Sequence, residues 1–208
     1  LIKILNFLKI TNKNTPQKQQ IEYKNNLKKI IIDNKKLDKI LNSEKKKIYF
    51  PLHFQPELTT SILGNNFDDQ VLILERLSRF ADNNWDVIVK DNPRQTFYQR
   101  GKFFFKRLKY LKNIHFVDSM EDSLTLIKKT DVTATVSGTP GWEAIKNKKK
   151  ALVFGESWYS GIHGCMKVNE NTNNDEINKF INEKFQESKF KSDFNNILSQ
   201  SYEGVIDL

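Results

Sequence analysis

Short apolar runs alternate with amphipathic stretches along most of the chain, and this alternation is typical of an α/β fold. Runs rich in Val, Ile and Phe predict strands at 48–52, 85–89, 114–117, 132–136 and 151–154. The intervening and following stretches predict helices at 67–81, 97–111, 123–129, 142–147, 175–185 and 193–201. Short connections between such elements favour a parallel sheet with right-handed crossovers and helices on both faces. The sequence therefore predicts a Rossmann-like α/β domain of about five strands over residues 47–208.

The N-terminal segment, residues 1–46, differs from the rest because it is rich in Lys, Asn and Gln. Residues 1–47 hold 13 Lys and four acidic residues, so they carry the whole formal charge of +9. Scattered apolar positions predict a helix over 21–41, which we interpret as a basic helical linker or the remnant of an upstream domain. The alternative is peripheral contact with an anionic membrane surface, where each nearby Lys contributes about 1 kcal/mol.

Charge and cysteine content narrow the classes of function and the compartment. The remaining 161 residues hold 21 basic and 21 acidic groups, and they contain no zinc-finger spacing, so nucleic-acid binding is not expected. Cys165, the single cysteine, cannot form an internal disulfide, which favours the cytoplasm. No apolar run approaches the roughly 20 residues of a membrane span, and the interrupted stretch 1–10 lacks the features of a signal peptide. Because the chain begins with Leu, we expect it to be a fragment of a longer protein.

The least generic polar residues follow predicted strands, where ligands bind in open parallel sheets. His53, Gln55 and Glu57 come after the first strand. This concentrated polar set suits either a ligand pocket or a turn whose side chains satisfy its own backbone.

A second polar loop follows the next strand and contains Lys90, Asn92 and Arg94. Two cations around an Asn-Pro turn are suited to bind phosphate. An ordinary charged turn explains the same residues equally well.

The strongest signal is the segment after the fourth strand, with the sequence SGTPGWEA. Thr139 is expected to cap a helix and Pro140 to occupy its first position. The free N–H groups and the helix dipole then make an anion site, to which hydroxyl groups add donors, and Glu143 is placed to accept from a ribose hydroxyl. The small residues of this site are Ser137, Gly138, Thr139 and Gly141.

A Gly-flanked loop after the fifth strand contains Trp158 and Tyr159. These rings suit stacking on a base or a sugar, or packing at the edge of the domain. Metal binding is not expected because His53, His115 and His163 match no ligand spacing, and no cofactor is implied. His115, within an apolar strand, is expected to be structural.

These segments together resemble the donor-binding domain of capsule polysaccharide biosynthesis proteins. The residues that carry the resemblance are YFPLHFQPE at 49–57, VKDNP at 89–93, SGTPGWEA at 137–144, and Phe154-Gly155 with Trp158-Tyr159. Such proteins are glycosyltransferases of the two-domain GT-B type, similar to the Kdo and sialic-acid transferases. The resemblance implies that this chain is one Rossmann-like half of a GT-B fold.

The resemblance also implies a function and roles for individual residues. The expected activity is sugar transfer from a nucleotide-sugar, CMP-sugar above all, to a capsular or lipopolysaccharide glycan, with a polysaccharide or glycolipid as acceptor. Lys90, Asn92, Ser137 and Thr139 would contact the donor phosphate. The catalytic residues remain unknown, because the base of similar enzymes usually lies in the other domain.

One departure from the family pattern keeps other functions open. Asn92 stands where His is usual, and an amide donates hydrogen bonds but never carries a positive charge. The alternatives are therefore a non-catalytic component of polysaccharide assembly or export, and a nucleotide-sugar epimerase.

Overall fold

The computed structural model of the chain describes residues 15–81 and 84–201, so the stretch 1–10 lies outside the described residues. Its strands are β1 (Lys46–Pro51), β2 (Trp85–Lys90), β3 (Ile114–Val117), β4 (Val132–Thr135), β5 (Lys150–Val153) and β6 (Cys165–Lys167). Its helices are α2 (Pro16–Ile30), α3 (Asn34–Leu41), α4 (Leu58–Ser61), the 3-10 turn η2 (Asn65–Phe67), α5 (Gln70–Ala81), α6 (Lys102–Leu108), α7 (Ser123–Lys129), α8 (Thr139–Lys146), α9 (Asn174–Asn182) and α10 (Glu187–Ser199).

The strands form one parallel sheet in the order β3-β2-β1-β4-β5-β6, which confirms the Rossmann-like fold. At its centre, Ile48 on β1 lies opposite Val87 on β2 and Val132 on β4. The sheet has six strands among the described residues where about five were expected. The additional strand, β6, has only three residues and none is buried, so it gives no apolar run along the sequence.

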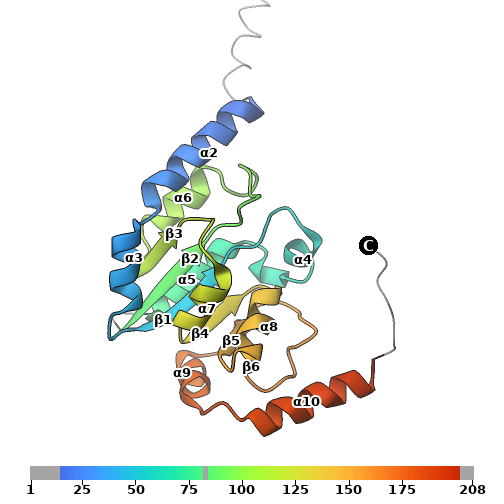
Figure 1. The fold of residues 1–208 in the computed structure, drawn as a ribbon. Helices are drawn as coiled ribbons and strands as arrows, with labels where there is room; N and C mark the ends of the chain where they lie inside the picture. Colours follow the sequence, from blue (N-terminus) through green and yellow to red (C-terminus); the bar gives the residue numbers. More distant parts are fainter. Residues whose placement is uncertain (1–14, 82–83, 202–208) are drawn as a thin grey trace, which may run out of the picture.

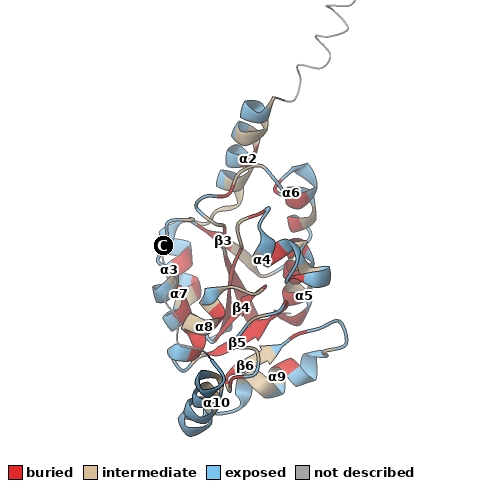
Figure 2. Cartoon of the chain, turned by 90° about the vertical axis from the view of Figure 1, so that its right-hand side faces the viewer, coloured by how far each residue is buried: buried red, intermediate tan, exposed pale blue. Residues whose placement is uncertain are grey.

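Helices cover both faces of the sheet, as Figures 1 and 2 show. On one face, Ile48 and Phe50 of β1 pack with α2, α5, α6 and α9. On the other face, Tyr49 of the same strand packs with α3, α7 and α8. Successive strand residues point to opposite faces, so the strands that are buried on both sides appear in the sequence as continuous apolar runs.

Several helices differ from the expected ones for identifiable reasons. The helix expected at 97–111 is shortened to α6, because residues 91–101 form a loop held by buried polar side chains. The helix expected at 21–41 is two helices, because Ile31 pairs with β3 and Asp33 then caps α3 through the N–H of Lys36. The helix expected at 67–81 begins at Gln70, after η2.

The described part of the basic N-terminal segment packs against the sheet. Tyr23 of α2 is buried against the α5 and α6 side, while Leu37 and Ile40 of α3 are buried beside α7. These apolar positions belong to the same core as the strands. The boundary expected at residue 46 therefore does not coincide with a break in the packing.

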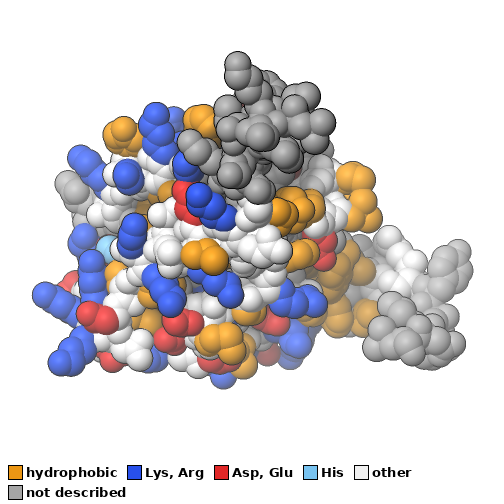
Figure 3. All heavy atoms as spheres, turned by 90° about the horizontal axis from the view of Figure 1, so that it is seen from above, with side chains coloured by type: hydrophobic (Ala, Val, Ile, Leu, Met, Phe, Trp, Pro, Cys, Tyr) orange, Lys and Arg blue, Asp and Glu red, His pale blue; other side chains and the backbone are white. Residues whose placement is uncertain are grey.

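Figure 3 shows how charged side chains are distributed over one face of the molecule. On the face seen from above in Figure 3, Lys and Arg side chains lie among acidic, apolar and uncharged ones. No helix within residues 15–81 and 84–201 is long and apolar enough to cross a bilayer.

The packing of α3 can be tested with two isoleucines on the basic N-terminal helices. Ile40 is 8% exposed and Ile21, on α2, is 60% exposed. We expect Ile40→Ala to lower the free energy of unfolding by about 2–4 kcal/mol, because it leaves a cavity in the core. The matched control, Ile21→Ala, should change it by less than about 0.5 kcal/mol. Equal, small effects in urea denaturation would show that α3 is a solvated linker.

Candidate functional site

A cleft of about 560 Å³ opens at the carboxyl edge of the sheet. It lies where the strand order reverses, between β1 and β4, which is the position at which open α/β sheets bind ligands. It is lined by residues 51–54 and 57 after β1, 90–93 after β2, Ser123 at the start of α7, 137–140 after β4, and Trp158 and Tyr159 after β5.

The structure brings most of the predicted site residues to this cleft. Those lining it are His53, Glu57, Lys90, Asn92, Ser137, Gly138, Thr139, Trp158 and Tyr159. Four predicted residues lie outside the lining: Gln55, Arg94, Gly141 and Glu143. Gln55 is buried behind the cleft, Arg94 is exposed, and Gly141 lies under the ring of Tyr159. Glu143 lies one turn along α8, near enough to Tyr49 and Lys90 for its charge to act on both.

Lys90 provides the positive charge of the cleft. Its Nζ donates to the carbonyl oxygen of Glu121 at 2.9 Å and to Oγ of Ser123 at 2.5 Å. An ammonium group has three donors, so one remains for a ligand. Burial lowers the pKa of Lys90, while the nearby carboxylates of Asp122, Glu121 and Glu143 oppose this shift. The ammonium is thus fixed at the cleft wall.

The start of α8 differs from the expected cap. Gly138, and not Thr139, is the N-cap residue, and it makes no side-chain cap hydrogen bond. A Cβ atom on Gly138 would lie 2.8 Å from Cε1 of His53, so only glycine fits there. The hydroxyl of Tyr159 donates to the Gly138 carbonyl, which fixes this turn. The first turn of α8 therefore faces the cleft without a side-chain cap. It offers fewer free N–H groups than expected, because Pro140 has none and the Gly141 N–H donates to the Gly138 carbonyl at 3.3 Å, so the helix dipole is what favours an anion here.

His53 is a neutral residue beneath this helix start. Its Nε2 lies 2.9 Å from Oγ1 of Thr135, and that oxygen also accepts from the N–H of Gly138 at 3.2 Å. Thr135 can then donate its hydroxyl hydrogen to Nε2, which suits an imidazole protonated on Nδ1. Burial, and secondly the charge of Arg100, lower the pKa of His53 to about 4. The histidine thus adds no positive charge at neutral pH.

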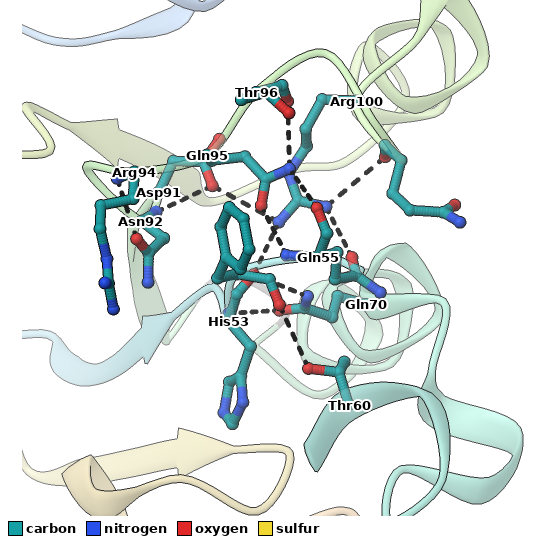
Figure 4. A network of polar contacts seen from close by, with 12 residues as sticks. His53, Gln55, Thr60, Gln70, Asp91, Asn92, Arg94, Gln95, Thr96 and Arg100 are labelled. Atoms are coloured by element: carbon teal, nitrogen blue, oxygen red, sulfur yellow. Dashed lines mark hydrogen bonds and ion pairs between the residues drawn. The ribbon is translucent and has the colours of Figure 1, made fainter. Parts of the chain in front are cut away.

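Two buried glutamines hold the loop after β1 by its backbone, as Figure 4 shows. The side chain of Gln70 accepts from the His53 N–H at 2.7 Å and donates to the His53 carbonyl at 3.1 Å. Gln95 makes the same pair of bonds with Gln55, at 2.8 and 2.9 Å. Each glutamine replaces the neighbouring strand that would otherwise satisfy these peptide groups.

A buried ion pair completes this network. Arg100 and Asp91 are each 1% exposed, and their side chains meet at 3.4 Å. Arg100 also donates to Oε1 of Gln55 at 2.7 Å and to the His53 carbonyl at 3.3 Å. Asp91 accepts from Tyr23 of α2 at 3.0 Å and from the N–H of Asn92 at 2.9 Å. Both carboxylate oxygens of Asp91 are thus occupied, so this group supports the cleft and is not available as a base.

The sequence-based analysis missed this network. The signal it left is Gln70, a polar residue on the stripe of α5 that otherwise buries Ile73, Leu74 and Leu77. A polar residue at a core-facing position needs a partner. Other members of the network, in particular Arg100 and Tyr23, come from distant segments and gave no local signal.

The aromatic wall of the cleft is formed by the loop after β5. Trp158 is 55% exposed, and its ring packs on Trp142 with the centroids 4.7 Å apart. Trp142 in turn contacts Phe194 of α10 at 5.3 Å. The exposed ring is therefore supported from behind and is available to stack on a planar or sugar ligand. His115, expected to be structural, bonds to Asp86 at 2.9 Å. Within the described ranges, no cluster of three His, Cys, Asp or Glu side chains is arranged to hold a metal ion.

Removing the buried cation tests the role of the network. Arg100→Met leaves Asp91 buried without its ion-pair partner, so we expect a loss of about 3–5 kcal/mol in unfolding free energy. Tyr23→Phe removes one hydrogen bond to the same carboxylate and should cost only about 1–2 kcal/mol. Chemical denaturation measures both, and a loss below 1 kcal/mol for Arg100→Met would show that the pair does not support the fold.

The neutral state of His53 predicts a dependence of stability on pH. Its pKa of about 4 lies below the unfolded value near 6.5, so the unfolded state binds more protons between these values. Stability should therefore be complete above pH 6.5 and fall by about 1–2 kcal/mol on acidification to pH 5. His53→Gln should lack this component, while all other titratable groups are shared by the two proteins. A titration of His53 followed by NMR with a midpoint above 6 would contradict the prediction.

Several solved structures have a fold similar to that of this chain. The UDP-GlcNAc 2-epimerase from Methanocaldococcus jannaschii is 19% identical with a TM-score of 0.51, over 95% of this chain and 53% of that one. A UDP-forming α,α-trehalose-phosphate synthase from Burkholderia xenovorans is 8% identical with a TM-score of 0.51, over 86% and 45%. The β-Kdo 2,7-transferase KpsC of Thermosulfurimonas dismutans is 16% identical with a TM-score of 0.48, over 73% and 52%. The first two likenesses confirm the expected fold, one Rossmann-like half of the GT-B type.

The chain spans about half the length of each of these structures. No curated protein sequence matches it. Residues 7–201 match the sequence model of a family described as capsule polysaccharide biosynthesis protein. Because this match extends over nearly the whole chain, the protein belongs to the capsule polysaccharide biosynthesis protein family.

Proposed function

We propose that this chain is the donor-binding part of a glycosyltransferase that moves a sugar from a nucleotide-sugar to a capsular or lipopolysaccharide glycan. The observation that carries the proposal is the cleft at the point where the strand order reverses, with the start of α8 and Lys90 on its walls. Family membership supports the same reading, and the acceptor would be a polysaccharide or glycolipid. The protein would act in the cytoplasm, with peripheral contact at the inner membrane through its basic N-terminal segment.

The proposed phosphate site combines one charge with several dipoles. The donor phosphate would lie against the first turn of α8, where the positive end of the helix dipole favours an anion. Ser137 and Thr139 supply hydroxyl groups, and Lys90 supplies an ammonium hydrogen. Negative charge grows on the phosphate as the sugar leaves, so these preorganised groups stabilise the transition state more than the bound donor.

The cationic content of the cleft favours a donor with a single phosphate. Among the described lining residues Lys90 is the only Lys or Arg, and His53 is neutral at pH 7. Asn92 carries no charge because its side chain is an amide. Its side-chain oxygen accepts from the N–H of Arg94 at 3.0 Å, so what it can add to the cleft is its amide donors. A CMP-sugar carries one phosphate charge and a UDP-sugar carries two, so one cation suits the CMP-sugar better. The exposed face of Trp158 would stack on the base or the sugar.

The catalytic base is proposed to come from outside the described cleft. Asp91 has both oxygens occupied, and the Nε2 of His53 is bonded to Thr135. Glu57 is an exposed carboxylate on the cleft rim and suits hydrogen bonding to sugar hydroxyls. The chain alone should therefore bind the donor without turning it over.

The likeness to a UDP-GlcNAc 2-epimerase favours a second candidate, a nucleotide-sugar epimerase. This activity needs no acceptor, so full-length protein incubated with UDP-sugars alone should yield an altered sugar detectable by NMR. The uncharged Asn92 favours a third candidate, a non-catalytic assembly or export component without measurable nucleotide affinity.

A thermal-shift panel of CMP, CDP, UDP, GDP and ADP tests the proposal. A ligand at 100 times its Kd adds about 2.7 kcal/mol, so CMP should raise the Tm by several degrees and the others by less. The double variant Ser137→Ala/Thr139→Ala should weaken CMP binding about tenfold, because it removes two hydroxyl donors. Ser188→Ala/Ser192→Ala, two exposed serines on α10, is the matched control. Selective stabilisation by UDP would favour the epimerase, and no shift with any nucleotide would favour the non-catalytic component.

A further inference from the structure

A polar groove lies beside the cleft and shares no lining residue with it. It consists of two cavities of about 390 and 460 Å³ that have Asn66, Phe67 and Glu170 in common. Its walls are η2 and the loop at 168–173 that joins β6 to α9, and one end extends along α5. Because β6 ends at the carboxyl edge of the sheet, this η2–α9 groove opens near the same edge as the cleft.

The loop at 168–173 is held in one shape. The guanidinium of Arg76 donates to the carbonyl oxygens of Asn169, at 2.5 Å, and Thr172. The side-chain oxygen of Asn169 accepts from the N–H groups of Asn171 at 2.9 Å and Thr172 at 3.1 Å. Binding to such a loop costs little conformational entropy, since the loop is ordered before the ligand arrives.

The groups on the groove walls are suited to sugars. Asn66 and Asn171 are exposed, and the amide of Asn171 offers two donors and an acceptor to neighbouring hydroxyls, while that of Asn66 offers one donor and an acceptor beside its bond to Glu170. The carboxylate of Glu170 accepts from the amide of Asn66 and can accept from hydroxyls on either side. Phe67 is half-buried and packs edge-on against Phe154, with the ring centroids 5.1 Å apart. A fixed aromatic ring with an electron-rich face attracts the C–H groups of a sugar ring.

The charges of the groove favour an acidic glycan. Arg76 and Arg79 lie one turn apart on α5 and both line the groove. Neither has a carboxylate within 4.0 Å among the described residues. Lys167, at the other end, is paired with Glu156. Glu170 offsets one of the two guanidinium charges, so one excess positive charge remains. Arg76 already holds the loop at 168–173, which leaves the Arg79 guanidinium to bind a carboxylate with bidentate hydrogen bonds.

We propose that the η2–α9 groove binds a carboxylate-bearing segment of the acceptor glycan. Phe154 at the groove and Trp158 at the cleft are four residues apart, so the chain between them spans at most about 14 Å. A short oligosaccharide covers this distance, so a glycan held in the groove could present its end to the cleft. Assigning the glycan as acceptor rests on the proposed sugar transfer, whereas glycan binding as such does not.

The test is direct binding of oligosaccharides to the 208-residue chain. Hexamers of galacturonic acid and of sialic acid are titrated to millimolar concentration and followed by ¹⁵N NMR, with neutral maltohexaose as comparison. We expect at least one acidic hexamer to shift the amide signals of residues 65–67 and 169–174, and maltohexaose to shift them at least fivefold more weakly. Arg79→Gln/Asn171→Ala should weaken the acidic hexamer at least fivefold. Asn195→Ala/Lys128→Gln, on α10 and α7, should not.

The outcomes separate the groove from the donor site. No shift in the groove with either acidic hexamer, or unchanged affinity in Arg79→Gln/Asn171→Ala, overturns the groove. Equal binding of maltohexaose overturns the acidic specificity. The same variants are tested for the CMP-induced rise in Tm, which groove substitutions should leave intact. Glycan binding without any nucleotide response would support the groove and contradict the proposed donor site.

Discussion

The cleft depends on the burial of Arg100 and Asp91 behind the loop after β1. That loop leaves the sheet at its centre, where two neighbouring strands end, and its peptide groups at His53 and Gln55 lie in the interior. Unpaired buried peptide groups are costly, so the loop can keep this path only if side chains replace the missing strand. Gln70 and Gln95 do this, and the Arg100 guanidinium links the loop to Asp91 of the neighbouring one. Two walls of the cleft are thereby fixed to each other.

The same network joins the basic N-terminal helices to the site. Tyr23 of α2 donates to Asp91, and Gln20 of the same helix accepts from the N–H of Phe97 in the adjoining loop. The lysines of α2 and α3 are exposed, while Tyr23, Leu37 and Ile40 complete the core on the two sheet faces. These helices can carry many lysines and also pack against the core, because the two kinds of side chain lie on opposite sides of each helix.

The cleft and the η2–α9 groove differ in their cationic groups, so they suit different anions. The cleft has one ammonium and a helix start, with a histidine that stays neutral because it is buried near Arg100. The groove has two guanidiniums, together with amides and a phenylalanine. A phosphate that must gain charge and then leave is better served by oriented dipoles than by several fixed cations, which would retain the product. A glycan carboxylate keeps its charge throughout, and planar guanidiniums match its geometry.

The sequence by itself determined the class of fold and the position of the cleft. Continuous apolar runs identify parallel strands that are buried on both faces of the sheet. The polar residues that follow such strands must meet at one edge of the sheet, as His53, Lys90 and Ser137 do. Tertiary structure alone decided which residues in the loops around the cleft are buried. It placed Gln55 and Arg100 in the interior, brought His53 so close to the N-cap residue Gly138 that no side chain fits there, and added β6, none of whose three residues is buried. These outcomes depend on contacts between segments tens of residues apart, such as Tyr23 with Asp91, which local patterns do not encode.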